Sequence, residues 1–464
     1  MSQFAFLFFQ VQFTKEGDTF QQSEVAALIG HITQTGDARP TDLLVMSHGW
    51  NNNTDEAKTL YSGLADKLAE QIRAMNALKT RRFSVCGALW PSKKFEDRDL
   101  IPGGAAALNE AVSEQHLRER IEDLKQLCNG DPNVDPRNAE AERALAEAQS
   151  LVDNLTEDPA AQKRAVQLIR GILSRDSADA EDASNRFFAL REDELLGQLS
   201  RSLNPPPRVP ERGGAAAIDP FSLEPVSGIG GAAGFRDVLG GIKSGFLHLL
   251  NFTTYYLMRD RAGKVGTKGV SPLIQVLRGT RPDLRVHLIG HSFGARVVTS
   301  AVNSLPGGNE FRANTMSLLQ GAFSHNGFAS QFDDTNDGAF REVVAQKKVR
   351  GPIVITHTRN DKAVGIAYPI ASRLAGQVAA ALGDENDLYG GLGSNGAQRT
   401  PERVVGALLD VGGDYPFKSG DISSRPYNLK ADRFISGHSD IIKPQVAYAI
   451  TVALASAGAL AAGG

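Results

Sequence analysis

Ser292 is the residue whose type and surroundings best fit nucleophilic chemistry. It stands at the centre of Gly290–Gly294, GHSFG, which fills a G-x-S-x-G frame. An apolar run, 286–289, precedes the frame, and apolar residues at helical spacing follow it. In a chain with 47 glycines, the five letters alone are weak evidence. The strand before them and the helix after them predict a sharp strand-to-helix turn, in which small residues permit the strained backbone. Ser292 is then expected at the carboxyl end of a strand, with its hydroxyl near the positive end of a helix.

A serine hydroxyl attacks efficiently only when a neighbouring base removes its proton. The acid and then the histidine are expected after the serine in the chain. Of the histidines that follow Ser292, His438 is the predicted base, because it lies in a polar loop, FISGHSDIIKP, just before the terminal helix. His357 falls inside a strand run, where burial is expected. His325, after a strand end, is the alternative base.

Asp361 is the predicted acid that holds the base. It follows the apolar run GPIVITHT in the loop RNDKAVG, at the carboxyl end of a strand, where site residues gather in parallel sheets. Asp440 lies two residues after His438 and is read as a cap for the last helix. The competing aspartates are Asp333, Asp334, Asp410, Asp414 and Asp440.

An acyl transfer also needs donors aimed at the oxyanion that develops on the carbonyl oxygen, typically two backbone N–H groups. Phe293, the residue after the nucleophile, is expected to supply one. Trp50 is expected to supply the other, from the loop His48-Gly49-Trp50 after the predicted strand 42–47, because glycine lets the backbone approach closely. The alternative is that glycine and asparagine form a turn here for local reasons.

The elements that must position these residues alternate between strand and helix, which predicts an α/β fold: a doubly wound, mostly parallel sheet covered on both faces. Asn53 followed by Glu56 is a capping-box signature for a helix start. The predicted strands are 4–13, 42–47, 83–90, 286–289, 315–324 and 351–358, and the predicted helices near the sheet are 23–33, 53–75, 271–278, 366–382 and 445–462.

The stretch 93–245 interrupts this alternation between an early strand and the serine. It has no convincing strand up to residue 203, and its charged amphipathic patterns predict helices, two with Asp-Pro starts, at Asp135 and Asp158. A Pro/Gly-rich connector follows. The predicted organisation is an α/β core in two parts, 1–92 and 246–464, around this helical insert. The insert is either a solvated elaboration without chemistry, or a cap over the pocket or docking surface for a protein partner.

A helix with an aromatic-rich face is predicted over 246–257. Packing against the sheet is the simpler interpretation of that face, and contact with a lipid or acyl chain is the alternative. The terminal segment 445–462 is apolar and rich in alanine, which indicates a buried closing helix better than a membrane span. The sequence therefore predicts no integral membrane segment.

The charge and cysteine content of the chain limit the partners and compartments that the sequence predicts. The 464 residues carry a formal net charge of −3, so nothing indicates nucleic acid as a partner. Two cysteines, Cys86 and Cys128, make no disulfide framework and fit a reducing, cytoplasmic compartment. The apolar amino terminus lacks a basic start and a cleavage site, which favours a first strand over a signal peptide. Export without a cleaved signal stays open.

No metal-ligand cluster, dinucleotide fingerprint or phosphate loop is found in the sequence, so no cofactor is predicted. The glycines near 228–234 follow no strand and are read as a linker.

Taken together, four motifs resemble the α/β-hydrolase superfamily, particularly its esterase and lipase-like members. They are SHGW after a strand, GHSFG at the elbow, NDKAVG after a late strand and GHSDI near the end. The resemblance covers 4–90 and 246–462. Caps in this superfamily more often follow the strand after the elbow, whereas this insert precedes it, and a glycine-rich loop, 389–396, and an apolar segment, 404–411, lengthen the span between acid and base.

The resemblance implies a nucleophile at Ser292, an acid at Asp361, a general base at His438, and an oxyanion hole at Phe293 and Trp50. It also implies a metal-free, two-step cleavage of a carboxylic ester through an acyl-enzyme, with lipid or acyl-glycerol esters ahead of peptides or thioesters. A serine peptidase or amidase is the alternative within the class. A non-catalytic scaffold that binds a protein partner through the insert is the alternative outside it.

Overall fold

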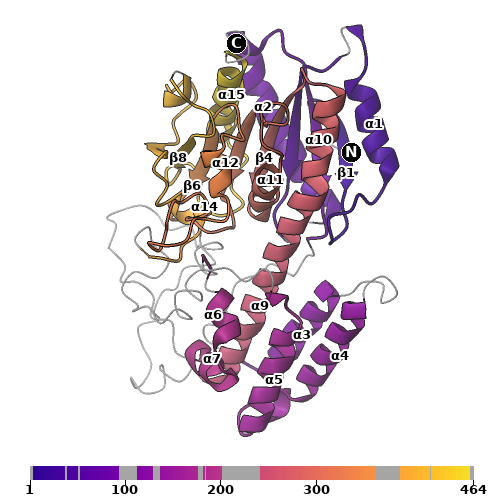
Figure 1. Cartoon of the computed structure of the whole chain (residues 1–464), viewed down its shortest axis with the longest axis vertical. Helices are drawn as coiled ribbons and strands as arrows, with labels where there is room; N and C mark the ends of the chain where they lie inside the picture. The colour runs from indigo at the N-terminus through magenta and orange to yellow at the C-terminus, as the bar shows by residue number, and fades with distance from the viewer. Residues whose placement is uncertain are drawn as a thin grey trace. The chain divides into compact units, whose positions relative to one another are not determined.

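The computed structural model describes residues 4–36, 39–50, 53–92, 112–128, 136–175, 181–182, 184–200, 241–361, 387–418 and 420–459. The chain divides into two compact units (Figure 1). The first comprises Met1–Lys94, Met258–Gly365 and Gly390–Gly464, and the second comprises Phe95–Leu257 and Ile366–Tyr389. The division therefore falls within the helix α9, Ile242–Lys264. The three-part organisation predicted from the sequence stays a prediction.

The first unit is built on a sheet in which every described strand runs parallel to its neighbours, in the order β1-β3-β2-β4-β5-β6-β8-β7. The predicted α/β fold is confirmed. The strands are β1 Leu7–Gln12, β2 Asp42–Ser47, β3 Phe83–Leu89, β4 Arg285–His291, β5 Thr315–Leu319, β6 Ile353–His357, β7 Val404–Ala407 and β8 Pro426–Lys430.

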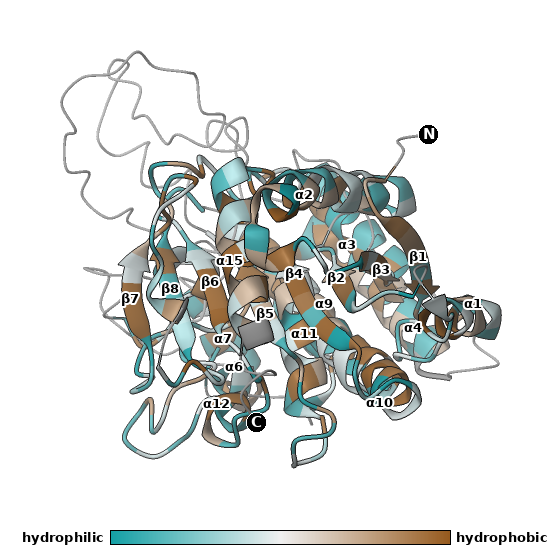
Figure 2. Cartoon of the chain, turned by 90° about the horizontal axis from the view of Figure 1, so that it is seen from above, coloured by the Kyte–Doolittle hydropathy of each residue, from teal (hydrophilic) through white to brown (hydrophobic). Residues whose placement is uncertain are grey.

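The central strands are apolar because helices cover both of their faces. Every residue of β2 and β3 is buried, and Figure 2 shows the strands largely in the hydrophobic colour. The two edges of the sheet are open. Leu7 on β1 is 57% exposed and Val405 on β7 is 70% exposed.

Two helices, α2 and α15, cover one face and pack against each other. The opposite face carries α11, which contacts β2, β4 and β5, together with α1 and α10. The helices of this unit are α1 Gln22–Ile32, α2 Thr54–Ala74, α10 Ser271–Thr280, α11 Phe293–Asn303, α12 Arg341–Ala345, α14 Leu392–Asn395 and α15 Pro444–Ala459. A π-helical segment, η5 Val265–Val270, leads from α9 into α10. Two short 3₁₀ segments, η2 Asn76–Leu78 and η7 Pro416–Lys418, precede β3 and β8.

The local signals for α2 and α15 act as predicted. The Asn53 side chain accepts from the Glu56 backbone and the Glu56 side chain accepts from the Asn53 backbone, so the capping box starts α2 directly after the loop that follows β2. In α15, Val446 and Leu454 are fully buried, as expected of a closing helix.

Other predictions near the sheet need correction. The strand predicted over 315–324 ends at Leu319, because Gln320 takes a φ of +46° and the chain leaves the sheet. Two strands were not predicted, β7 and β8. The sequence of β8, PYNLK, has no apolar pattern, because a polar residue, Asn428, occupies a buried position. The Asn428 side chain is satisfied there by hydrogen bonds to both backbone groups of Ala397. The helix predicted over 366–382 lies outside the described residues.

Among its described residues, the second unit contains helices joined by turns and bends, and no strand. Its helices are α3 Glu114–Cys128, α4 Pro136–Ser150, α5 Pro159–Gly171, α6 Ser184–Ala189, α7 Glu192–Leu199, the first part of α9, and the 3₁₀ turn η3 Val152–Asn154. Asp158 caps α5 by accepting from Ala160 N at 2.8 Å. Asp135 and the connector up to residue 240 lie outside the described ranges.

The aromatic face of α9 packs inside this helical unit. The Phe252 and Phe187 rings stack with centroids 4.6 Å apart, and Tyr256 meets Phe188 edge-on at 5.6 Å. The face therefore packs against α6, and the prediction that it packs against the sheet is wrong. Among the described residues, no helix combines the length and the apolar character needed to cross a membrane.

Candidate active site

Ser292 alone separates β4 from α11, so strand becomes helix across one residue. It has φ 57° and ψ −125°, a conformation that costs a non-glycine residue energy and that the surroundings must impose. The backbone at the end of β5 and in the loop after it imposes it in part. Ser292 N donates to Leu319 O at 3.0 Å, and Ala322 N donates to Ser292 O at 3.0 Å.

The two glycines of the motif are required by close packing. A Cβ on Gly290 would lie 2.3 Å from Gly294 O, and one on Gly294 would lie 2.1 Å from Ser47 O. Both separations are impossible for real atoms. The start of α11 therefore packs directly against β4, as the motif predicted, and also against the end of β2, which was not predicted.

The structure brings His438 and Asp361 to Ser292. His438 Nε2 lies 2.8 Å from Ser292 Oγ, and His438 Nδ1 lies 2.9 Å and 3.0 Å from the two oxygens of Asp361. The Asp361 side chain is fully buried, whereas that of His438 is 20% exposed. The carboxylate can only accept, so Nδ1 carries a proton and, in the neutral ring, Nε2 is free to accept the serine proton.

The sheet topology explains why these residues meet. The chain after β2 goes to β3 on one side, while the chain after β4 goes to β5 on the other, so the carboxyl ends of β2 and β4 form a topological switch point. Ser292 follows β4 at this point. Asp361 and His438 follow β6 and β8, further along the same edge of the parallel sheet.

The loops that carry the acid and the histidine are bound to each other. Asn360 Nδ2 donates to Ile435 O at 2.8 Å. Asp432 accepts from Thr358 Oγ1 at 2.9 Å and from Arg359 N at 3.1 Å. Neither contact was predicted from the sequence, because the partners lie more than 70 residues apart and no local pattern links them.

The glycine-rich segment supports the acid. Gly393 N donates to Gly321 O at 2.9 Å, and a Cβ on Gly393 would lie 2.8 Å from Asp361 Oδ2. Backbone thus lies directly against the carboxylate. The segment that lengthens the span between Asp361 and His438 is packed beside the acid.

The competing acids and bases are used elsewhere. Asp440 accepts from Ser436 N at 3.0 Å and pairs with Lys443, so it closes the loop around His438. His325 is buried, with Nδ1 3.1 Å from Asn395 Nδ2. His357 ends β6 and is only partly buried, contrary to expectation. Of the remaining aspartates, Asp333 accepts from Thr335 N and Asn336 N, and Asp410 pairs with Arg433.

The loop predicted to supply an oxyanion donor lies against the serine. A Cβ on Gly49 would lie 2.5 Å from Ser292 Cβ and 3.0 Å from Oγ. The Trp50 and Phe293 rings meet edge to face, with centroids 6.2 Å apart. The structure therefore brings together the two residues predicted to donate, one from each side of the switch point.

His48 fixes this loop through all four of its hydrogen-bonding groups. Its N–H donates to Tyr61 Oη at 2.9 Å, and its carbonyl accepts from Trp90 Nε1 at 3.0 Å. Ring Nδ1 donates to Gly49 O at 2.9 Å, and Nε2 accepts from Trp90 N at 3.3 Å. Burial lowers the pKa of His48 to about 4, so the ring is neutral and this pattern persists at neutral pH.

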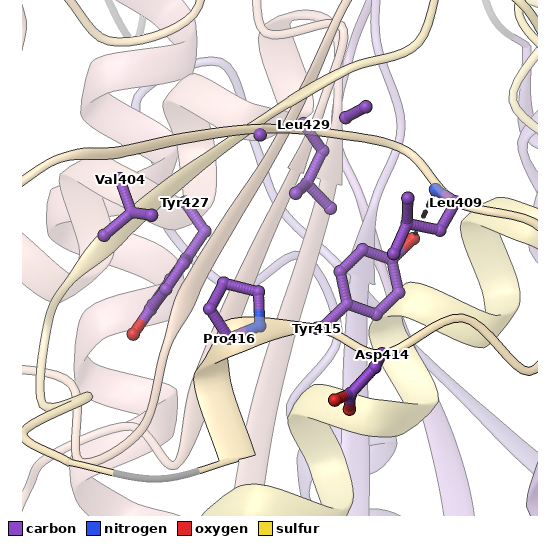
Figure 3. A pocket seen from close by; sticks show the side chains of 9 residues that line it. Val404, Leu409, Asp414, Tyr415, Pro416, Tyr427 and Leu429 are labelled. Atoms are coloured by element: carbon purple, nitrogen blue, oxygen red, sulfur yellow. Dashed lines mark hydrogen bonds between the residues drawn. The ribbon is translucent and has the colours of Figure 1, made fainter.

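A separate cavity of about 190 Å³ lies at the β7 edge (Figure 3). Tyr427, Tyr415 and Leu429 line much of it, and the Tyr415 hydroxyl accepts from Leu409 N at 2.9 Å. β7 is four strands from β4, which is about 19 Å at usual strand spacing. The cavity is therefore not part of the Ser292 site.

Within the described ranges, no three His, Cys, Asp or Glu side chains gather as ligands for a metal ion. No family model, curated protein or solved structure matches this chain. The fold and the site define the chain as an α/β protein with a parallel sheet and a hydrogen-bonded serine–histidine–aspartate row beside its switch point.

Proposed function

We propose that the chain is a serine hydrolase of the α/β-hydrolase type, which cleaves a carboxylic ester through an acyl-enzyme on Ser292. One observation carries the proposal. Ser292 Oγ, both ring nitrogens of His438 and the Asp361 carboxylate form a continuous hydrogen-bonded row, with contacts of 2.8 and 2.9 Å. A buried carboxylate, an imidazole and a strained serine in this order are the parts of a nucleophilic acyl transfer.

Each residue then has one role. His438 Nε2 removes the proton as Ser292 Oγ attacks the ester carbonyl, and Asp361 stabilises the imidazolium that results. The imidazolium next protonates the departing alcohol, which leaves an acyl group on Ser292. Water enters, gives its proton to His438 and attacks the acyl carbonyl, and the carboxylic acid departs as Ser292 recovers its proton.

The oxyanion that forms in both steps is assigned to the backbone N–H groups of Phe293 and Trp50. The close approach of Gly49 to Ser292 supports this assignment, because it leaves no side chain between the loop and the serine. The rigid hydrogen bonding of His48 supports it further, since donors in a preorganised loop need no rearrangement as charge develops.

The role of the helical stretch and the ester class are finer parts of the proposal. A cap over the site or a docking surface for a protein partner remains the proposed role of 93–245. Lipid or acyl-glycerol esters remain the proposed substrates by resemblance alone, because the aromatic face of α9 is occupied by packing against α6.

A fluorophosphonate probe tests the proposal without knowledge of the substrate, because it reacts with a serine whose base and oxyanion hole are assembled. We expect labelling of the wild type and none of Ser292→Ala or His438→Ala. Ser439→Ala, an exposed serine beside the base, is the matched control and should label like the wild type. Failure of the folded wild type to label would contradict the proposal.

Two further measurements separate the alternatives. Nitrophenyl esters of increasing chain length, compared with the matching anilides, distinguish an esterase from an amidase, since the same three residues serve both. Rates that rise with chain length and at an interface favour lipid esters. If Ser292→Ala leaves every measurable function intact, the scaffold interpretation replaces the enzyme.

A further inference from the structure

His291, the residue before the nucleophile, hydrogen-bonds the backbone of the proposed base. Its Nε2 lies 2.9 Å from His438 O, and the two rings are 5.0 Å apart, centroid to centroid. A carbonyl oxygen can only accept, so His291 donates from Nε2–H. The residue is buried, with 7% of its surface exposed.

The position of His438 explains why such an anchor matters. Its loop follows β8, which is three strands from β4, or about 14 Å at usual strand spacing. The loop must therefore return past the ends of β6 and β5 to reach Ser292. Asn360 holds Ile435 and Asp440 holds Ser436, whereas His291 binds the backbone of His438 itself.

The second ring nitrogen of His291, Nδ1, indicates that the side chain does more than fill space. His291 Nδ1 is buried, and no described residue hydrogen-bonds it. A buried polar atom without a partner is unfavourable, so an apolar side chain would fill this space at a lower cost. The feature that only the histidine supplies is the donor to His438 O. Burial and the neighbouring His438 lower the pKa of His291 to about 3, which keeps it neutral.

We infer that His291 is a positioning residue of the proposed reaction, whose Nε2–H donor holds the His438 backbone so that the imidazole stays within reach of Ser292 Oγ. The inference rests on the proposed function. The carboxyl end of β4 therefore carries two residues of the proposed site. Ser292 is the nucleophile, and His291, directly before it, anchors the base.

Two variants separate the donor from the space it fills. His291→Gln retains an amide donor that can reach His438 O, whereas His291→Leu has a similar volume and no donor. Thermal unfolding of the full chain establishes that both variants fold. Two readouts are compared with the wild type: the rate of fluorophosphonate labelling, and amide hydrogen exchange in the loop 434–443.

We expect His291→Leu to label about 10- to 100-fold more slowly, because small displacements of a catalytic group cost rates of this order. Its loop should exchange faster. His291→Gln should restore most of both properties. Wild-type labelling and exchange in folded His291→Leu would overturn the inference, and so would equal losses in both variants, since then the imidazole shape and not the donor would matter.

The exchange measurement keeps this inference distinguishable from the proposed function. If the wild type does not label, the proposed function fails and the catalytic role of His291 fails with it. If the wild type labels and the loop is equally protected in the wild type and His291→Leu, only the anchoring inference fails.

Discussion

Gly49 and Ser292 lie so close that no other residue fits at position 49, because a Cβ there would stand 2.5 Å from Ser292 Cβ. Gly49 follows β2 and Ser292 follows β4. Their contact brings the loop proposed to bind the oxyanion against the proposed nucleophile. The substitution Gly49→Ala must therefore displace either the loop or the serine.

We predict that Gly49→Ala reduces fluorophosphonate labelling by about 100-fold or more, as expected of a misplaced reacting group, while the protein stays folded. Gly30→Ala is the control, because nothing lies within 4 Å of a Cβ at this exposed position in α1. It should label normally and raise the free energy of unfolding by about 0.5–1 kcal/mol. Normal labelling of Gly49→Ala would contradict the predicted close approach.

Asp361→Asn should lower ester turnover by about 10³- to 10⁴-fold, because an amide neither stabilises the imidazolium nor holds the required tautomer. Asp440→Asn is the matched control, because Asp440 lies in the same loop as His438 but hydrogen-bonds Ser436 and not the imidazole. Its ester turnover should stay within about threefold of the wild type. Steady-state kinetics of the two variants decides the assignment, and a larger loss in Asp440→Asn would reverse it.

Tyr61→Phe should slow labelling because it removes the hydroxyl that accepts from His48 N and donates to Ala88 O. The buried His48 N–H is left without this acceptor, so we expect a loss of about 1–3 kcal/mol in the free energy of unfolding. The labelling rate should fall with it, since the loop that carries Gly49 and Trp50 loosens. A destabilised variant with an unchanged labelling rate would show that the loop does not depend on this bond.

Arg81→Ala should cost about 3–5 kcal/mol in the free energy of unfolding, measured by urea, because it removes the closest ion-pair partner of the buried Asp42 carboxylate. Asp42 lies at the amino end of β2, whereas the proposed site lies at the carboxyl ends of the strands. The carboxylate also contacts His287 Nε2 at 3.0 Å, accepts from Thr41 Oγ1 at 2.6 Å and lies 3.7 Å from Arg285 Nη1. Labelling per folded molecule should not change. A loss below 1 kcal/mol would show that Arg81 does not hold the carboxylate.

Acid should weaken the fold partly through Asp42. Burial alone would raise the pKa of this carboxyl, but the hydrogen bonds from Arg81 and His287 lower it well below its usual range. A depressed folded-state pKa gives stability that is present above the unfolded-state pKa, about 3.9, and is lost as the pH falls below it. Unfolding free energies at pH 3 and pH 7 should therefore differ less in Asp42→Asn than in the wild type.

The sequence predicted the elements that have strong local signals. The run 42–47 matched a strand that is buried throughout, and the Asn53–Glu56 pair marked the start of α2. The glycines around Ser292 predicted the turn because close packing there excludes a side chain. Chain order and loop position then singled out Asp361 and His438, which the fold does bring together with Ser292.

The rest depended on contacts between distant residues. Nothing local marks β8 as a strand, because Asn428 becomes buried only through its bonds to Ala397. The donors and acceptors around His48 come from α2 and from the end of β3, so spacing along the chain could not reveal them. The anchoring bond from His291 to His438 O spans 147 residues.

The central claim, an acyl-enzyme on Ser292, is tested most directly by trapping it. The wild type is mixed with a nitrophenyl ester, quenched in acid while turnover continues, and digested for mass spectrometry of the peptide that contains Ser292. We predict the acyl mass on Ser292 in the wild type, and neither an adduct nor turnover in Ser292→Ala. Turnover that continues unchanged in Ser292→Ala would contradict it.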